Sequence, residues 1–152
     1  MEAKTILLVE DNPNDEELTL RALRKHDLAH RVVVARDGVE ALDHLFGRGA
    51  QAGQPLAPEL VLLDLKLPKV DGLSVLAEMR ANPTTRLVPI VVLTSSVEER
   101  DRCTAYERGA NSYVRKPIDF VEFAEVVRQL GRYWLVLNQP PPRAGRSLLP
   151  RD

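Results

Sequence analysis

The chain has 152 residues, of which 44% are hydrophobic and 28% are charged. This balance is typical of one globular domain with a packed core, and it excludes an intrinsically disordered chain. The 21 basic and 22 acidic side chains leave a net charge of −1, so the composition gives no reason to expect a nucleic-acid partner.

The sequence also lacks the features of membrane and zinc proteins. No apolar segment approaches the ~20 residues that span a bilayer, and the short run Ile6–Val9 leads directly into two acidic residues instead of a signal-peptide core. The single cysteine, Cys103, excludes an intramolecular disulfide, and no Cys/His spacing of a structural zinc site is present. We therefore expect a cytoplasmic protein that does not enter a membrane.

Five short apolar runs recur along the chain, and most are continuous rather than alternating. Such runs indicate strands that are buried on both faces, as in a parallel sheet. The runs are Ile6–Val9, Val32–Ala35, Leu60–Leu63, Val88–Leu93 and Tyr113–Val114.

A helical pattern follows each apolar run. We expect the first, third, fourth and fifth helices to begin at polar capping residues, namely Asn14, Asp71, Ser96 and Asp119, with Glu17, Glu99 and Glu122 completing capping boxes for Asn14, Ser96 and Asp119. The alternation of strand and helix predicts an α/β fold with parallel strands, right-handed crossovers and helices on both faces of the sheet. Periodicity alone leaves the order of the strands open.

Polar residues with complementary chemistry follow four of the five runs: Glu10 and Asp11, Asp64 and Thr94 come directly after theirs, and Lys116 comes after the fifth run. Taken singly, each is more commonly a cap, a turn residue or a solvated charge. Because ligands of open α/β sheets bind beyond the carboxyl ends of the strands, we expect these side chains to converge at one site.

This set is suited to hold one phosphorylated aspartate. Two carboxylates about 4 Å apart repel by about 4 kcal/mol at an effective dielectric near 20, and a hard divalent cation such as Mg²⁺ relieves that repulsion with oxygen ligands. The set contains no His or Cys, which disfavours zinc or copper. A carboxylate can attack phosphorus, while Lys116 neutralises charge and Thr94 donates a hydrogen bond.

Together these motifs resemble the receiver domains of response regulators in two-component systems, over about Lys4 to Leu130. The segments that carry the resemblance are Leu7–Asp11, Leu62–Pro68, Asp71-Gly72, Val92–Ser95 and Lys116-Pro117. The resemblance implies a flavodoxin-like (βα)5 fold with strand order 2-1-3-4-5, and a receiver domain over residues 1–132.

The resemblance also implies a role for each site residue. Asp64 would accept a phosphoryl group from a histidine kinase and, with Asp11, ligate Mg²⁺. Glu10, where the family often has aspartate, would reach the metal through water, and Lys66 would reach it through its backbone carbonyl.

The other implied roles concern phosphate binding and switching. Lys116 would bind the phosphoryl group and precede a cis peptide bond to Pro117. Thr94 and Tyr113 would form the switch that alters the surface of the fourth helix, fifth strand and fifth helix.

A narrower resemblance concerns the small regulators that work with cyanobacterial and bacterial phytochromes. It rests on the long loop Gly47–Pro58, the run Leu67–Gly72 and the ending Tyr133–Leu135 before the prolines. It implies a sensor histidine kinase of the phytochrome type as partner, and a homodimer.

We expect residues 133–152 to form a C-terminal dimerisation arm, because Trp134, Leu135 and Leu137 are hard to bury in a monomer and exposed apolar side chains suggest an interface. Too few residues follow the fifth helix for an effector domain. A single-domain regulator of this kind would act by binding an unknown downstream target or by onward phosphotransfer.

Two other functions compete with this interpretation. A metal-dependent aspartyl-phosphate phosphatase or phosphotransferase would need a general acid near Asp64 and a cap over the site, yet the segment after Asp64 offers Lys66 instead of a second carboxylate. A nucleotide-binding protein would need a glycine-rich loop after the first strand, where this chain has Glu10 and Asp11. We therefore expect a signalling protein that is not an enzyme, although it assists its own phosphotransfer and dephosphorylation.

Overall fold

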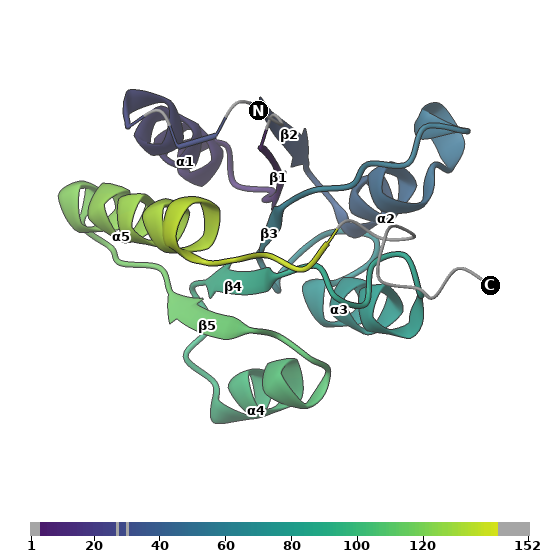
Figure 1. The fold of residues 1–152 in the computed structure, drawn as a ribbon. Helices are drawn as coiled ribbons and strands as arrows, with labels where there is room; N and C mark the ends of the chain where they lie inside the picture. The colour runs from purple at the N-terminus through teal and green to yellow at the C-terminus, as the bar shows by residue number, and fades with distance from the viewer. Residues whose placement is uncertain (1–3, 27, 30, 143–152) are drawn as a thin grey trace.

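The structure is a computed structural model that describes residues 4–26, 28–29 and 31–142. Five parallel strands form one sheet in the order β2-β1-β3-β4-β5, and a helix follows each strand (Figure 1). The strands are β1 (Thr5–Val9), β2 (Arg31–Ala35), β3 (Leu60–Leu63), β4 (Ile90–Thr94) and β5 (Ser112–Arg115). The helices are α1 (Pro13–Lys25), α2 (Gly38–Phe46), α3 (Gly72–Ala81), α4 (Glu99–Glu107) and α5 (Phe120–Arg132), with two short helical segments, η1 (Gly49–Gln51) and η2 (Tyr133–Leu137). The predicted flavodoxin-like fold and strand order 2-1-3-4-5 are confirmed.

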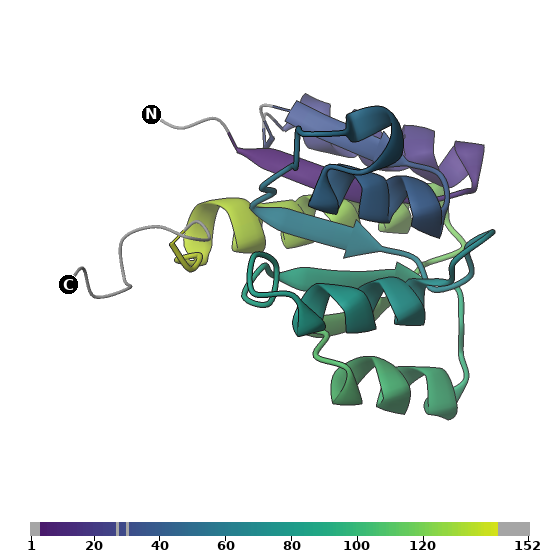
Figure 2. The same cartoon turned by 90° about the vertical axis from the view of Figure 1, so that its right-hand side faces the viewer.

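The sheet separates two hydrophobic clusters. Along β1, Leu7 and Val9 belong to the cluster that α2 and α3 cover, whereas Ile6 and Leu8 belong to the cluster that α1 and α5 cover. Both ribbon views show these two helix pairs on opposite faces (Figures 1 and 2). Since both faces are covered, successive residues of the inner strands are buried, from Ile6 to Val9 and throughout β3 and β4, which explains why these apolar runs are continuous.

The helix starts follow the predicted caps in part. Asp71 accepts a hydrogen bond from the amide of Ser74, and Asp119 caps α5 in the same way, as predicted. The prediction for α1 is wrong by two residues, because Asn12 and not Asn14 is the cap. Pro13 explains the difference, since its fixed φ and missing N–H suit the first helical position.

The start of α4 also differs from the prediction. The helix begins at Glu99, and the residue at its N-cap, Glu98, makes no side-chain capping bond. Ser96 lies two residues before that cap, so the predicted Ser96–Glu99 capping box is not formed. Ser96 instead donates its hydroxyl hydrogen bond to Asp101 in the first turn.

The C-terminal part of α5 continues as the π-helical segment η2. Leu135 is only 4% exposed and packs in the cluster beneath α1 and α5, so the prediction that it is exposed is wrong. The continuation carries Leu135 past the start of β1, where Lys4 donates a hydrogen bond to its carbonyl oxygen. Leu137 is 57% exposed, as predicted, and Trp134 is half-buried.

Residues 143–152 of the predicted arm lie outside the described residues. Within the described part of the chain, no helix has the length and apolarity needed to cross a lipid bilayer.

Candidate functional site

The predicted site residues meet at the carboxyl edge of the sheet. Backbone hydrogen bonds between neighbouring strand ends fix their positions: the amide of Glu10 donates to Ala35 (2.9 Å), and the amide of Asp64 donates to Val9 (3.1 Å). The amide of Lys116 likewise donates to the carbonyl of Thr94 (2.8 Å). The sheet therefore brings together residues that are more than 100 positions apart in the chain.

Asp64 lies at the centre of the site and is 7% exposed. Its Oδ1 accepts hydrogen bonds from the hydroxyl of Thr94 (2.8 Å) and the amide of Leu65 (2.7 Å). Its Oδ2 accepts one from Nζ of Lys116 (2.8 Å). Both oxygens of the carboxylate are thus held in a fixed orientation by donors.

Gly72, at the start of α3, is packed directly behind this aspartate. A Cβ atom added to Gly72 would lie 2.1 Å from the carbonyl oxygen of Asp64, a distance at which the backbone would have to move. Glycine therefore allows the close approach of α3 to the strand that carries Asp64.

Lys116 is the cation of the site. Its Nζ lies 2.6 Å from Glu10 Oε1, 2.8 Å from Asp15 Oδ2 and 2.8 Å from Asp64 Oδ2, and its side chain is 5% exposed. Burial alone would lower the pKa of Lys116, but its hydrogen bonds with Asp15, Asp64 and Glu10 outweigh burial and raise the pKa above the ordinary range. The ammonium therefore stays charged.

Asp15 belongs to the site although it was not among the predicted site residues. It lies in the first turn of α1, the helix that begins at the edge of the sheet where Glu10 follows β1. An acidic residue in that turn must lie near the strand ends, and this signal was available in the sequence.

Glu10 is almost completely buried, with 2% of its surface exposed. Burial raises its pKa to about 7, and the nearby Lys116 opposes that rise without cancelling it. Without a metal cation, the carboxyl group of Glu10 therefore binds a proton near neutral pH even beside Lys116.

The acidic side chains of the site fit a hard cation. Glu10, Asp11 and Asp64 each offer a carboxylate oxygen, and these oxygens all lie within 4.8 Å of one another. Asp11 is exposed, which leaves a path from solvent to the cluster. Carboxylate oxygens are ligands for Mg²⁺ or Mn²⁺, and none of the three residues is a softer His or Cys ligand.

The two predicted switch residues are connected through Ser96. Thr94 is fully buried and its hydroxyl already contacts Asp64. Tyr113 is half-buried against the cluster beneath α2 and α3, and its hydroxyl donates to the carbonyl of Ser96 (3.4 Å). The amide of Ser96 points to the Thr94 hydroxyl (3.4 Å), so one residue joins the two side chains.

The prediction of a cis peptide bond before Pro117 is wrong, since every peptide bond among the described residues is trans. The trans backbone already lets Lys116 reach three carboxylates. Cis and trans forms of an X–Pro bond differ by only about 0.5–1 kcal/mol, so local sequence does not determine the choice.

Comparisons with known proteins agree with this geometry. The family model of the response regulator receiver domain matches residues 6–128. The probable methanogenesis regulatory protein FilR2 of Methanothrix harundinacea is 41% identical over 136 residues, which cover 90% of this chain and 86% of FilR2. Response regulator Rcp1 of Synechocystis sp. is 39% identical over 132 residues, which cover 87% of this chain and 89% of Rcp1.

Two solved structures are similar over almost their whole length. The phosphorylated cyanobacterial phytochrome response regulator RcpA superimposes with a TM-score of 0.88 at 38% identity, covering 93% of this chain and 100% of RcpA. The Mn²⁺-bound form of Rcp1 superimposes with a TM-score of 0.86 at 37% identity, covering 91% of this chain and 99% of Rcp1.

Proposed function

Because the chain belongs to the family of response regulator receiver domains, we propose that it is a signalling protein that accepts a phosphoryl group on Asp64 from a sensor histidine kinase. The observation that carries this proposal is the position of the Asp64 carboxylate. It lies 2.8 Å from both the Thr94 hydroxyl and the Lys116 ammonium, beside the carboxylates of Glu10 and Asp11. The alternative, a phosphatase or phosphotransferase enzyme, is not favoured by the family match.

The transfer uses the groups of the site in distinct roles. A carboxylate oxygen of Asp64 attacks phosphorus, the P–N bond to the donor imidazole breaks, and the imidazole leaves with its electron pair and takes up a proton. Lys116 and Thr94 then bind phosphoryl oxygens, and neither needs to gain or lose a proton. The hydrogen bonds that Thr94 and Lys116 donate to Asp64 support Asp64 as phosphoacceptor and the other two as its catalytic partners.

We propose Mg²⁺ as the cofactor, bound by Asp11 and Asp64 directly, by Glu10 through water and by the backbone carbonyl of Lys66. When bound, the cation supplies positive charge that offsets the carboxylates and the phosphoryl oxygens. The acidic cluster and the Mn²⁺-bound form of Rcp1 support a divalent cation at this position.

We propose that a phosphoryl group on Asp64 attracts the Thr94 hydroxyl more strongly than the free carboxylate does. Through Ser96, this change shifts the conformations that the Tyr113 side chain adopts. The surface formed by α4, β5 and α5 would then change its population of states. The hydrogen bonds of Ser96 with both side chains support this coupling.

A kinase partner must bring its phosphohistidine to Asp64, so its docking surface surrounds the mouth of the site. Next to Lys116, three apolar side chains are strongly exposed: Ile118 (96%), Phe120 (70%) and Val121 (78%). Exposed apolar side chains in a group are typical of an interface. We propose that they contact a kinase of the phytochrome type, a choice supported by the similarity to RcpA.

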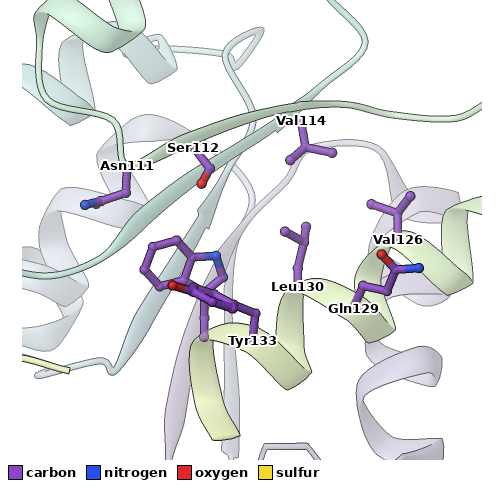
Figure 3. A pocket seen from close by; sticks show the side chains of 8 residues that line it. Asn111, Ser112, Val114, Val126, Gln129, Leu130 and Tyr133 are labelled. Carbon is purple, nitrogen blue, oxygen red and sulfur yellow. The ribbon is translucent and has the colours of Figure 1, made fainter. Parts of the chain in front are cut away.

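We also propose that the receiver domain spans residues 1–132 and that residues 133–152 extend it as an arm of a homodimer. A groove of about 580 Å³ lies between β5 and the C-terminal part of α5, where Leu130, Tyr133 and Val114 line it (Figure 3). Val136 and Leu137, which follow the groove residue Tyr133 in η2, are 50% and 57% exposed. Sedimentation of the full chain should show a dimer that Leu137→Ser weakens; a monomer at high concentration, with and without beryllofluoride, would contradict this proposal.

The phosphoacceptor can be mapped chemically with phosphoramidate, whose P–N bond resembles that of phosphohistidine. After reaction, borohydride reduces an aspartyl phosphate to homoserine, which peptide mass spectrometry locates. We expect the modification in the peptide that contains Asp64. Its consistent appearance at another residue would disprove the assignment.

A further inference from the structure

Helix α4 is held to the molecule by few apolar contacts. Ala105 is the only residue of α4 that is buried, and Glu98 provides no side-chain cap. Figure 1 shows the helix at the outer edge of the molecule, beyond β5. Polar contacts at its N-terminus therefore carry an unusual share of its attachment.

Those polar contacts converge on Asp101 in the first turn of α4. Its Oδ2 accepts a hydrogen bond from the hydroxyl of Ser96 (2.6 Å) and lies 3.4 Å from Nζ of Lys66. The side chain of Asp101 is 14% exposed, whereas that of Lys66 is 67% exposed. The hydrogen bond from Ser96 keeps the pKa of Asp101 below its usual range, so the carboxylate is charged at neutral pH.

Both partners of Asp101 also touch the phosphoacceptor or the switch. The backbone amide of Lys66 lies 3.4 Å from Asp64 Oδ1, and Ser96 contacts Thr94 and Tyr113 through its backbone. Asp101 is therefore linked to the site by two separate routes, although it does not touch Asp64 itself.

We propose that Asp101 is a positioning residue that anchors α4 to the mouth of the site, and that a phosphoryl group on Asp64 competes with it for Lys66. This inference rests on the proposed function, and it names the contacts through which phosphorylation of the site would affect α4. A phosphoryl group carries a charge of about −1.5 to −2, against −1 for a carboxylate. An ion pair whose lysine is mostly exposed to solvent, as Lys66 is, is weak, so the stronger anion can take Lys66 away. Asp101 then keeps only Ser96, and the first turn of α4 opens more often.

Hydrogen exchange of the full chain, read by mass spectrometry in the peptides of α4, tests the anchor. Without a phosphodonor, Asp101→Ala should speed exchange in α4 by about fivefold, the change expected for one lost hydrogen bond. The matched control is Glu99→Ala, which removes a carboxylate from the same turn that is 92% exposed and lies 3.7 Å from the guanidinium of Arg102. It should exchange like the unmodified chain.

The competition is tested by adding acetyl phosphate and Mg²⁺. Phosphorylation should speed hydrogen exchange in α4 of the unmodified chain but should cause little further acceleration in Asp101→Ala. The variant Asp101→Asn keeps an oxygen acceptor for Ser96 and loses the charge that attracts Lys66. It should show slower exchange than Asp101→Ala and little response to phosphorylation.

The outcomes distinguish failure of the Asp101 anchor from failure of the proposed phosphoryl transfer. Equal exchange in Asp101→Ala and the unmodified chain, or equal acceleration in Glu99→Ala, overturns the anchor whether or not Asp64 is phosphorylated. Unchanged α4 exchange in a chain whose mass shows full phosphorylation overturns the competition for Lys66. A chain that takes up no phosphoryl group contradicts the proposed function instead, and the comparison without phosphodonor still decides the anchor.

Discussion

Lys116 balances part of the negative charge that the strand ends bring together. Three carboxylates surround its ammonium, so the site keeps a net negative charge even with Lys116 in place. A divalent cation and a phosphoryl group can then enter as a pair, because the cation offsets the carboxylates and Lys116 offsets the phosphoryl oxygens.

Replacing Lys116 by alanine should therefore affect both stability and phosphorylation. The variant leaves buried carboxylates without their cation, and we expect the free energy of unfolding to fall by about 3 kcal/mol. Phosphoryl uptake from acetyl phosphate should fall by about 100-fold, as for loss of one donor to a developing charge. Urea unfolding and mass spectrometry measure the two effects. The exposed neighbour Arg115, changed to alanine, is the control and should alter neither.

The proton on Glu10 makes cation binding depend on pH. Burial raises the pKa of Glu10 to about 7, and a nearby cation favours the deprotonated form, so the apparent affinity for Mg²⁺ should rise as the pH rises through about 7. The same shift means that the metal-free folded state holds this proton more tightly than the unfolded state. The bound proton of Glu10 therefore stabilises the folded state at low pH. This contribution to the free energy of unfolding is lost as the pH rises from 4.5, the ordinary pKa of glutamate, to about 7.

Calorimetric titration with Mg²⁺ at several pH values measures this dependence, and buffers of different ionisation enthalpy count the protons released. Glu10→Gln keeps the shape of the side chain without its titration and should flatten the dependence. An equal slope in this variant would show that another group is responsible.

At the scale of elements, strand ends were easier to predict than helix ends. A continuous apolar run ends where the strand ends, so the sequence correctly predicts Asp64 directly after β3 and Glu10 directly after β1. Helix starts depend on a choice between neighbouring caps, and Pro13 moved the start of α1 to Asn12. The burial of Leu135 is not predicted because it comes from packing in the cluster beneath α1 and α5, a tertiary contact that the helical pattern of α5 does not reveal.

Leu135 provides a direct test of how η2 is attached. Leu135→Ala should lower the free energy of unfolding by about 2–5 kcal/mol, because it empties a buried position. Leu137→Ala, two residues later and 57% exposed, should change it by less than about 0.5 kcal/mol in the monomer. Urea unfolding at low protein concentration compares the two, and similar losses would mean that η2 does not pack as described.

At the scale of the whole molecule, the strand order places β1 and β3 side by side at the middle of the sheet. This order puts the carboxylates of Glu10 and Asp64 together and sets Lys116, at the end of the edge strand β5, across from them. The periodicity of the sequence could not supply this order, which only the family resemblance implied. The sheet thereby connects Asp64, at the end of β3, through β4 to the edge strand β5 beside α4 and α5.

The most direct test of the account is the intact mass of the protein after incubation with acetyl phosphate. With Mg²⁺, the mass should increase by one phosphoryl group, and it should not increase with a chelator or in Asp64→Asn. A phosphoryl group on Asp64→Asn, or equal uptake without any divalent cation, would contradict the assignment of the acceptor or of the metal site.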